Sequence, residues 1–287
     1  MRRQKGSGSL RAVRAIRAMR LVGVVVLTST YFVIAPISYL VFWLYCSMPT
    51  RNPPGRARVL RFIMSRGFRL MHDVLRILHI VDFDPRELEP RIPRGACVMV
   101  ANHPTLMDIS GLLAAEKDLV FPVKPSLFRS FWARPLLAGA ELFEGSGPEA
   151  FGVGDMIDEA VARVRQGRRV IIFPEGTRSP AGGMHRFGRA AFEIAVRAGV
   201  DVVPIVVRCD PPWLTKDRGF LDPPSECPLL RFRPLEPVSP AEAGSSSRRL
   251  RGIVRSRILA ELEDRNPPQE RQERRDTQAE GYDGRIA

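Results

Sequence analysis

The sequence predicts an α/β fold: a single mixed-sheet domain with helices on both faces, preceded by an N-terminal membrane-anchoring helical segment. Short runs rich in β-branched residues alternate with segments of helical pattern, which is typical of α/β domains. The 287 residues allow one domain of about 200 residues plus extensions. A stretch without charged residues runs from Leu21 to Thr50 and is long enough to cross a bilayer as a helix.

Each element follows from local pattern. Gly167 and Gly199 stand where helices commonly end. After Pro240 one more helix is expected, and the polar, charged segment Asn266–Ala287 is expected to be disordered. Strands are expected near 97–101, 119–123, 140–143, 170–173 and 202–207, and helices near 108–116, 126–138, 155–166, 188–198 and 248–264.

The segment 21–48 is predicted to be the membrane anchor, because it exceeds the core of a signal peptide and no small-x-small cleavage site follows it. Arginines flank it on both sides, which favours a cytoplasmic location for both ends. Pro36 lies near its middle and can bend it. A re-entrant or hairpin anchor is therefore favoured, and a single pass with the amino terminus outside is the alternative.

The basic charge is confined to one end of the chain. Residues 1–72 hold 13 of the 44 Lys and Arg and none of the 31 acidic residues, so the rest of the chain has 31 of each. Basic charge beside the most apolar segment favours an anionic membrane surface as partner. No nucleic acid is expected, since RRM, KH and zinc-finger patterns are absent from the sequence.

These patterns divide the chain into five parts. Within the third part, residues 60–80 mix apolar side chains (Leu60, Ile63, Met64, Met71, Val74, Leu75 and Leu78) with arginines, which predicts an amphipathic helix on the membrane surface. The parts are a basic amphipathic arm (1–20), the membrane anchor (21–48), a basic amphipathic helix region (49–84), an α/β catalytic domain (85–240), and a C-terminal helix with a disordered tail (241–287).

The four cysteines are scattered without C-x-x-C spacing, so we expect buried thiols in a reducing compartment, no metal and no prosthetic group.

The first polar string, Asn102 to Asp108, follows a predicted strand. His103 is a candidate base and Asp108 a candidate carboxylate to hold its second nitrogen. Five residues correspond to about 500° around a helix, so the two side chains can meet only if the chain turns between them. Alternatively, Asp108 only caps a helix. His72 and His79 are expected to be lipid-surface or packing residues.

The second polar string, Glu175-Gly176-Thr177-Arg178, also follows a predicted strand. Gly176 permits a tight turn and Arg178 can bind phosphate through two nitrogens. An ordinary turn with a surface arginine is the alternative.

Both strings, in this order and about seventy residues apart, resemble the motifs of the glycerolphosphate and lysophosphatidate acyltransferase family over about residues 90–210. The resemblance implies transfer of a fatty acyl group from acyl-CoA or acyl-carrier protein to the hydroxyl of a lyso-lipid acceptor. It implies that His103 and Asp108 are catalytic and that Glu175, Gly176, Thr177 and Arg178 form the acceptor loop. It also implies a location at the cell membrane, with the catalytic domain on the cytoplasmic face.

The sequence departs from the family pattern at one place. Glu144 and Gly145 stand where the family usually carries Asp-Arg, and a carboxylate there would repel a phosphate. Lys124 and Arg189 are candidate substrate-binding cations. Arg129 and Arg134 also lie nearby, and Arg129 is expected to belong to a solvated basic face.

Two alternatives therefore stay open: acylation of a non-phosphorylated or specialised lipid or pigment acceptor, and a catalytically silent membrane scaffold.

Overall fold

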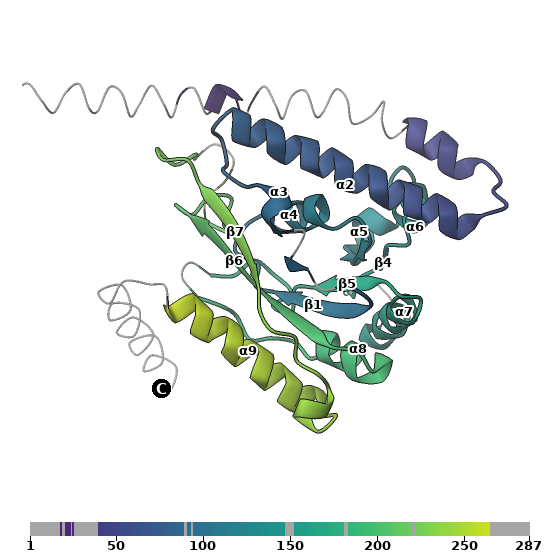
Figure 1. The fold of residues 1–287 in the computed structure, drawn as a ribbon. Coiled ribbons are helices and arrows are strands. Elements are labelled where there is room, and N and C mark those ends of the chain that lie inside the picture. The colour runs from purple at the N-terminus through teal and green to yellow at the C-terminus, as the bar shows by residue number, and fades with distance from the viewer. Residues whose placement is uncertain are drawn as a thin grey trace, which may run out of the picture.

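The computed structural model describes residues 40–88, 91–92, 94–146, 152–180, 183–217, 219 and 222–264, together with residues 18, 21–23 and 25. A five-stranded sheet in the order β2-β5-β1-β6-β7 forms its centre (Figure 1). Four of these strands run parallel, and β7 pairs with β6 in the antiparallel direction. The strands of this sheet are β1 (Cys97–Ala101), β2 (Leu119–Val120), β5 (Arg169–Ile172), β6 (Val202–Asp210) and β7 (Leu229–Pro234).

Helices cover both faces of the sheet, as predicted (Figure 1). One face carries α2 (Pro53–Ile77), α3 (Pro85–Leu88), α4 (Asp108–Ala115), α5 (Pro125–Phe128) and α6 (Arg134–Gly139); the other carries α7 (Val153–Arg165), α8 (Ala190–Ala198) and α9 (Ser247–Asp264), with the short 3-10 turn η2 (Ala241–Ala243) before α9.

The central strand β1 is buried on both sides. Val98 and Val100 belong to one hydrophobic cluster, whereas Cys97, Met99 and Ala101 belong to the other. This alternation follows from the period of two along a strand, and the continuous apolar run is what a parallel strand covered on both faces requires.

Three predicted elements differ from the structure. The strand expected at 119–123 is two short strands, β2 and β3 (Pro122–Val123), and β3 pairs with β4 (Phe143–Glu144) in a separate two-stranded sheet. The strand expected at 140–143 is mostly a turn, with Glu141 at φ 64°. The helix expected at 126–138 is broken into α5 and α6, because Pro135 cannot donate a helical hydrogen bond and is tolerated only in a first turn.

The sequence reasoning missed β7. Its burial alternates, with Leu230 and Phe232 buried and Arg231 and Arg233 exposed. That alternation is the pattern of a strand with one solvated face, so the signal was present in the sequence.

The amphipathic helix predicted at 60–80 is α2, but it packs against the protein more than expected. Asn52 caps it by accepting a hydrogen bond from Gly55 N at 3.0 Å. Leu60 and Leu75, two of the apolar side chains expected at the lipid surface, are buried in the core. A 25-residue helix can bury one face and expose the other, and the sequence alone did not indicate which apolar residues lie on which face.

Within the described residues, no helix is both long enough and apolar enough to cross a membrane. The predicted anchor at 21–48 lies largely outside those residues, since 24 and 26–39 are not described. The predicted basic arm at 1–20 and the predicted disordered tail after Asn266 lie almost entirely outside them as well.

Arg61 corrects the expectation that the arginines of this helix face lipid. Its side chain is buried, pairs with Glu141 at 2.5 Å and Asp118 at 3.4 Å, and donates to Ala140 O. It therefore joins α2 to the turn that precedes β4.

We predict that Arg61→Ala lowers the free energy of unfolding by about 2 kcal/mol or more, because the partly buried Glu141 and the buried Ala140 carbonyl lose a charged donor. The matched control is Arg58→Ala, which alters an exposed arginine one turn away and should change stability by less than about 0.5 kcal/mol. Urea denaturation measures both. Equal effects would mean that Arg61 is not a structural residue.

His72 is a packing residue, one of its two predicted roles, whereas His79 is exposed. The rings of His72 and Phe83 pack in a T-shaped arrangement, and His72 Nε2 lies 3.1 Å from Ser110 Oγ in α4. Ser110 Oγ donates to Met107 O, so it accepts from His72 Nε2–H. Burial lowers the pKa of His72 to about 4, and nearby Asp73 only partly opposes this.

We predict a pH dependence of stability from His72. Between pH 6.5 and about 4 the unfolded chain binds a proton at this residue that the folded chain does not. The free energy of unfolding should therefore fall as the pH falls through that window, by up to about 1.4 kcal/mol per pH unit. His72→Gln keeps a donor for Ser110 and should show a shallower slope in urea denaturation. Identical slopes in both proteins would contradict the assignment.

Candidate active site

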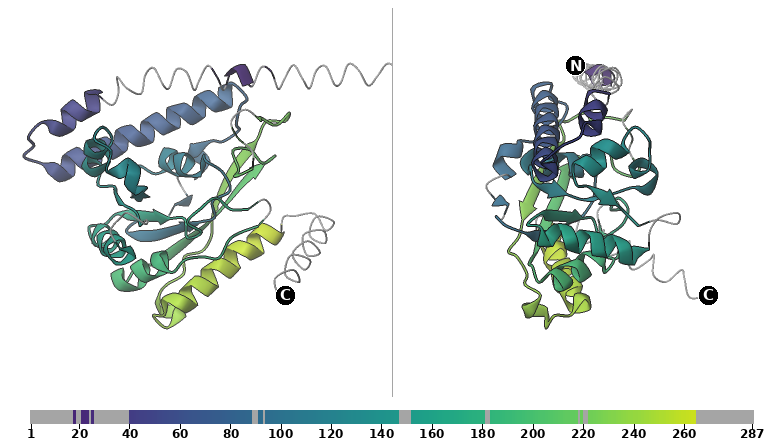
Figure 2. Two further views of the ribbon diagram at one scale, coloured as in Figure 1. Left: turned by 180° about the vertical axis from the view of Figure 1, so that it is seen from behind. Right: turned by 90° about the vertical axis from the view of Figure 1, so that its right-hand side faces the viewer.

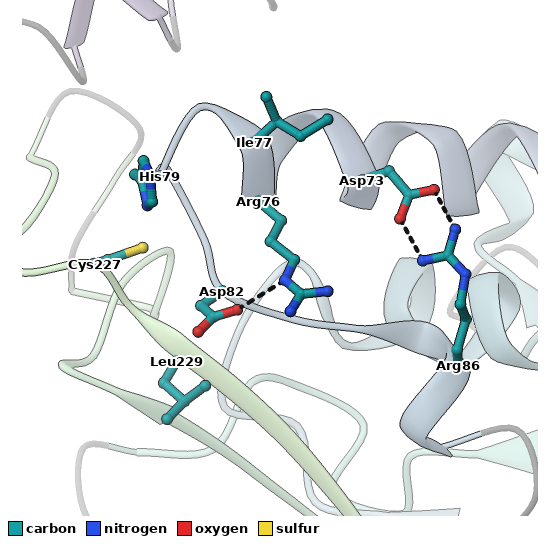
Figure 3. Close-up of a pocket in the computed structure, with 8 residues that line it drawn as sticks. All are labelled: Asp73, Arg76, Ile77, His79, Asp82, Arg86, Cys227 and Leu229. Atoms are coloured by element: carbon teal, nitrogen blue, oxygen red, sulfur yellow. Dashed lines mark hydrogen bonds and ion pairs between the residues drawn. The ribbon is translucent and has the colours of Figure 1, made fainter.

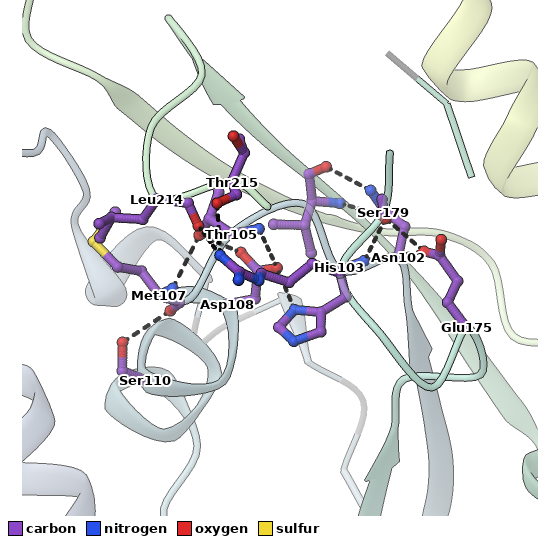
Figure 4. Close-up of polar contacts among 12 residues, drawn as sticks. Asn102, His103, Thr105, Met107, Asp108, Ser110, Glu175, Ser179, Leu214 and Thr215 are labelled. Atoms are coloured by element: carbon purple, nitrogen blue, oxygen red, sulfur yellow. Dashed lines mark hydrogen bonds and ion pairs between the residues drawn. The ribbon is translucent and has the colours of Figure 1, made fainter. Parts of the chain in front are cut away.

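The two polar strings lie side by side because their strands are neighbours. β1 and β5 pair in parallel, with Val100 opposite Ile172, so both strings leave the sheet at the same edge. The carboxyl edge of parallel strands is where α/β domains place their sites. Figure 4 shows the first string and Glu175 facing each other across this edge.

Asn102 anchors the start of the first string. Its buried side-chain amide donates to Val207 O at 2.8 Å and accepts from Val207 N at 2.7 Å. The amide thereby continues the pairing of β1 with β6 for one more residue and fixes where the chain leaves the sheet. Sequence reasoning assigned it no role.

His103 and Asp108 meet through the turn that their spacing requires. His103 Nδ1 lies 2.8 Å from Asp108 Oδ2. Thr105 holds the same carboxylate by donating its N–H to Oδ2 at 2.9 Å and its hydroxyl to Oδ1 at 2.8 Å. Thr105 Oγ1 also accepts from Met107 N, which closes the turn into α4 (Figure 4).

The electrostatic setting of this pair is a buried carboxylate next to a partly exposed imidazole. Asp108 is fully buried. Burial raises the pKa of the Asp108 carboxyl, and the hydrogen bonds from His103 and Thr105 act in the opposite direction. The His103 ring stacks on Phe173, with centroids 4.3 Å apart. The contact with Asp108 leaves His103 Nε2 as the nitrogen available for chemistry.

Glu175 connects the second string to the first. Its Oε1 accepts from His103 N at 3.2 Å and from Ser179 Oγ at 2.6 Å. Its Oε2 accepts from His185 N at 2.7 Å. Glu175 therefore binds the main chain of the first string at His103 and that of the segment after its own loop at His185. Gly176 makes the turn of the loop at φ 69°.

Ser179 is a site residue that the sequence reasoning missed. Its N–H donates to His103 O at 2.7 Å, and its hydroxyl accepts from His103 N at 3.0 Å while donating to Glu175. The backbone of His103 is thus clamped by the second string. Its position directly after Arg178 was the only feature of the sequence that could have indicated a role in the site.

Arg178 lies within the site region but is already engaged. Its Nη1 donates to Leu214 O at 3.1 Å and to Thr215 O at 2.6 Å. Backbone carbonyls of the loop after β6 thus accept hydrogen bonds from one nitrogen of Arg178. No role was predicted for this loop from the sequence. Gly176 and Thr177 are exposed at the tip of the loop.

The other two predicted substrate-binding cations lie at helix starts. Lys124 directly precedes α5 and Arg189 directly precedes α8. Both side chains are exposed, and their roles stay predictions.

Arg129 differs from its prediction as a solvated basic residue. Its Nε lies 2.7 Å from Oε1 of the buried Glu144. This ion pair balances the carboxylate at the position where the family resemblance leads one to expect an arginine.

Among the described residues, no group of three or more His, Cys, Asp and Glu side chains is arranged to hold a metal ion.

An open pocket of about 810 Å³ lies between the end of α2 and the start of β7 (Figure 3). Its charged residues pair with one another: Arg86 makes two contacts with Asp73, at 2.8 and 2.9 Å, and Arg76 lies 3.3 Å from Asp82. The lining contains none of the predicted site residues.

We predict that neutral His103 carries its proton on Nδ1. The Asp108 carboxylate can only accept, and Thr105 already donates to it, so the ring must donate from Nδ1. Long-range ¹H–¹⁵N spectra of ¹⁵N-histidine-labelled protein, assigned with His103→Ala, report the tautomer. Asp108→Asn should raise the population of the Nε2–H form. An Nε2–H form dominant in the unsubstituted chain would contradict the geometry.

Comparison with known proteins agrees with the fold and with the family resemblance. The family model described as Acyltransferase matches residues 81–208. Human 1-acyl-sn-glycerol-3-phosphate acyltransferase beta is 32% identical over 125 residues, which are 43% of this chain and 44% of the relative. The 1-acyl-sn-glycerol-3-phosphate acyltransferase of Pseudomonas aeruginosa is 30% identical over 163 residues, which are 56% of this chain and 62% of the relative. The chain spans about half the length of the curated relatives it matches.

The crystal structure of the 1-acyl-sn-glycerophosphate (LPA) acyltransferase, PlsC, from Thermotoga maritima has the same fold. The TM-score is 0.60 at 22% identity, over 88% of this chain and 97% of the other. Both polar strings lie inside the matched segment. The match to the acyltransferase family thus covers residues 81–208 of this chain.

Proposed function

We propose that this chain is a membrane-bound O-acyltransferase. It moves a fatty acyl group from acyl-CoA or acyl-carrier protein to a hydroxyl of a lysophosphatidate-like acceptor. The observation that carries the proposal is the hydrogen bond between His103 and the buried Asp108, beside a glycine turn that ends in Arg178. The names of the relatives support the choice of acceptor.

In the proposed mechanism, His103 Nε2 takes the proton of the acceptor hydroxyl as its oxygen attacks the thioester carbonyl. The new C–O bond forms, the C–S bond breaks, and the imidazolium returns the proton to the departing thiolate. Asp108 stabilises the imidazolium and fixes the ring, as a carboxylate does in hydrolytic triads. An acyl-enzyme is not required, since the acceptor attacks directly.

The proposal gives the remaining predicted residues supporting roles. Glu175 holds the acceptor loop, and Gly176, Thr177 and Arg178 bind the acceptor. Lys124 and Arg189 add positive potential for its phosphate. Arg178 keeps Nη2 and Nε for this purpose, because its contacts with Leu214 and Thr215 use Nη1.

Membrane attachment and the five-part division of the chain belong to the same proposal. The acid-free, basic first 72 residues and the uncharged stretch from Leu21 to Thr50 support attachment to an anionic membrane. The proposed location is the cell membrane, with the catalytic domain on the cytoplasmic face.

A second candidate is acylation of a non-phosphorylated lipid alcohol. It is favoured by Glu144, which stands where the family resemblance implies an arginine. Its pairing with Arg129 balances the carboxylate and leaves no net positive charge from the two.

The test is acyl transfer by detergent-purified full-length chain from labelled acyl-CoA and acyl-carrier protein to lysophosphatidate, monoacylglycerol and a long-chain alcohol. We predict transfer to lysophosphatidate, with a rate about 10²- to 10⁴-fold lower in His103→Ala. The matched control is His79→Asn, an exposed histidine at φ 51°, where asparagine tolerates the same backbone.

The acceptor panel separates the candidates. Transfer confined to the non-phosphorylated acceptors favours the second one. Transfer that His103→Ala leaves unchanged contradicts the mechanism. Absence of transfer to every acceptor favours a silent scaffold.

A further inference from the structure

Residues 125–133, which are α5 and the loop that joins it to α6 (together called the α5–α6 loop below), expose an unusual amount of apolar surface. Leu127, Phe131 and Trp132 are exposed to 49%, 67% and 59%. Single exposed apolar residues are common on proteins, but three large ones within six positions, two of them aromatic, mark a contact surface.

The exposed charged side chains of this loop are basic, whereas Glu144, which pairs with its Arg129, is buried. Residues 124–139 contain no Asp or Glu. Lys124 and Arg134 are exposed and lie on either side of the apolar residues. An aromatic patch with cationic neighbours complements an anionic lipid surface, where tryptophan favours the headgroup level and Lys and Arg meet lipid phosphates.

The loop continues into a second surface of the same composition. Phe131 contacts Trp43, with ring centroids 6.1 Å apart. Gly139 of α6 packs closely against Leu60 and Cys46. In the right-hand view of Figure 2 the helical residues 40–47 lie beside both α2 and the α5–α6 region.

That neighbouring surface is also apolar and basic. Residues 40–72 contain no acidic side chain. Its exposed side chains include Leu40, Val41, Leu44, Met48, Val59, Phe62, Ile63 and Leu70, together with Arg58 and Arg66.

We propose that the α5–α6 loop is a lipid-docking element, which inserts Leu127, Phe131 and Trp132 into the headgroup region of an anionic bilayer. It acts beside the apolar and basic surface of residues 40–72 but is separate from it in sequence. The proposal rests on membrane attachment in the proposed function and assigns it a surface within the acyltransferase domain. A second copy of the chain fits this face less well, since two such faces would bring like charges together.

Tryptophan fluorescence tests the insertion. Trp43→Phe leaves Trp132 exposed and Trp213 buried as an internal reference. We predict that vesicles of phosphatidylglycerol and phosphatidylcholine with brominated acyl chains quench this variant, and that adding Trp132→Phe removes the quenching. Pure phosphatidylcholine vesicles should quench it little. Vesicle-bound protein whose Trp132 is not quenched would overturn the proposal.

A substitution pair tests the contribution to binding. Phe131→Ser with Trp132→Ser should lower partitioning of the full-length chain onto anionic vesicles about tenfold. The matched control is Val153→Ser, which removes a 54% exposed apolar side chain at the start of α7 and should change partitioning little. Sedimentation velocity gives the alternative outcome: a change from dimer to monomer without loss of vesicle binding would identify a protein interface and overturn the proposal.

Measurements of acyl transfer distinguish failure of the lipid-docking proposal from failure of the proposed acyltransferase function. The Phe131/Trp132 double variant should keep transfer to a short-chain acceptor in detergent and lose it to an acceptor embedded in vesicles. Equal transfer on vesicles by the double variant and the unsubstituted chain would contradict the docking role. Absence of transfer by every variant, with quenching of Trp132 intact, would contradict the proposed function and support the docking surface.

Discussion

The burial of one carboxylate dictates the local structure of the site. Asp108 has no contact with solvent, and a buried carboxylate is tolerated only when donors surround it. Three donors come from two residues of the preceding turn, His103 and Thr105. The turn is therefore held by the same bonds that orient the imidazole. Beneath it, Ser110 accepts from His72 of α2 and donates to the backbone at Met107, so the packing of α2 also supports the start of α4.

A second carboxylate, that of Glu175, also positions His103, but it does so from the loop that follows the neighbouring strand β5. Glu175 and Ser179 bind the backbone of His103 on both sides, so the imidazole is held at its ring by Asp108 and at its main chain by the neighbouring loop. Charge in this region is largely balanced by protein partners. Arg129 balances Glu144, and carbonyl oxygens of Leu214 and Thr215 engage Arg178. In the proposed function, recognition of an acceptor phosphate depends on the remaining nitrogens of Arg178 and on the exposed Lys124 and Arg189.

The sequence was sufficient to predict those parts of the fold and the site whose pattern lies within a few consecutive residues. The helix–strand alternation, the run Cys97–Ala101 and the two polar strings after strands predicted the sheet, its helices and the meeting of His103 with Asp108. It was insufficient wherever partners lie far apart in the chain. Ser179 has no distinguishing neighbours in sequence, and its contact with His103 depends on the pairing of β1 with β5. Leu214 and Thr215 contribute only backbone oxygens, which any residue could supply. Arg61 was assigned to lipid because its neighbours are basic and apolar, whereas its partners Asp118 and Glu141 follow tens of residues later.

Helix α2 buries one face in the core and exposes apolar and basic side chains on the other, and this limits how far the chain can be shortened from its N-terminal side. Its composition resembles the N-terminal segment that precedes it, yet Ala57, Leu60 and Leu75 complete the core from outside the segment that the family model matches. A fragment that begins at residue 81 would lack Leu60 and Leu75 and would leave uncovered the face of α4 that packs on α2. A fragment that begins near Thr50 would keep Asn52, whose side chain caps the helix. The folding unit thus starts about thirty residues before the segment that the family model matches.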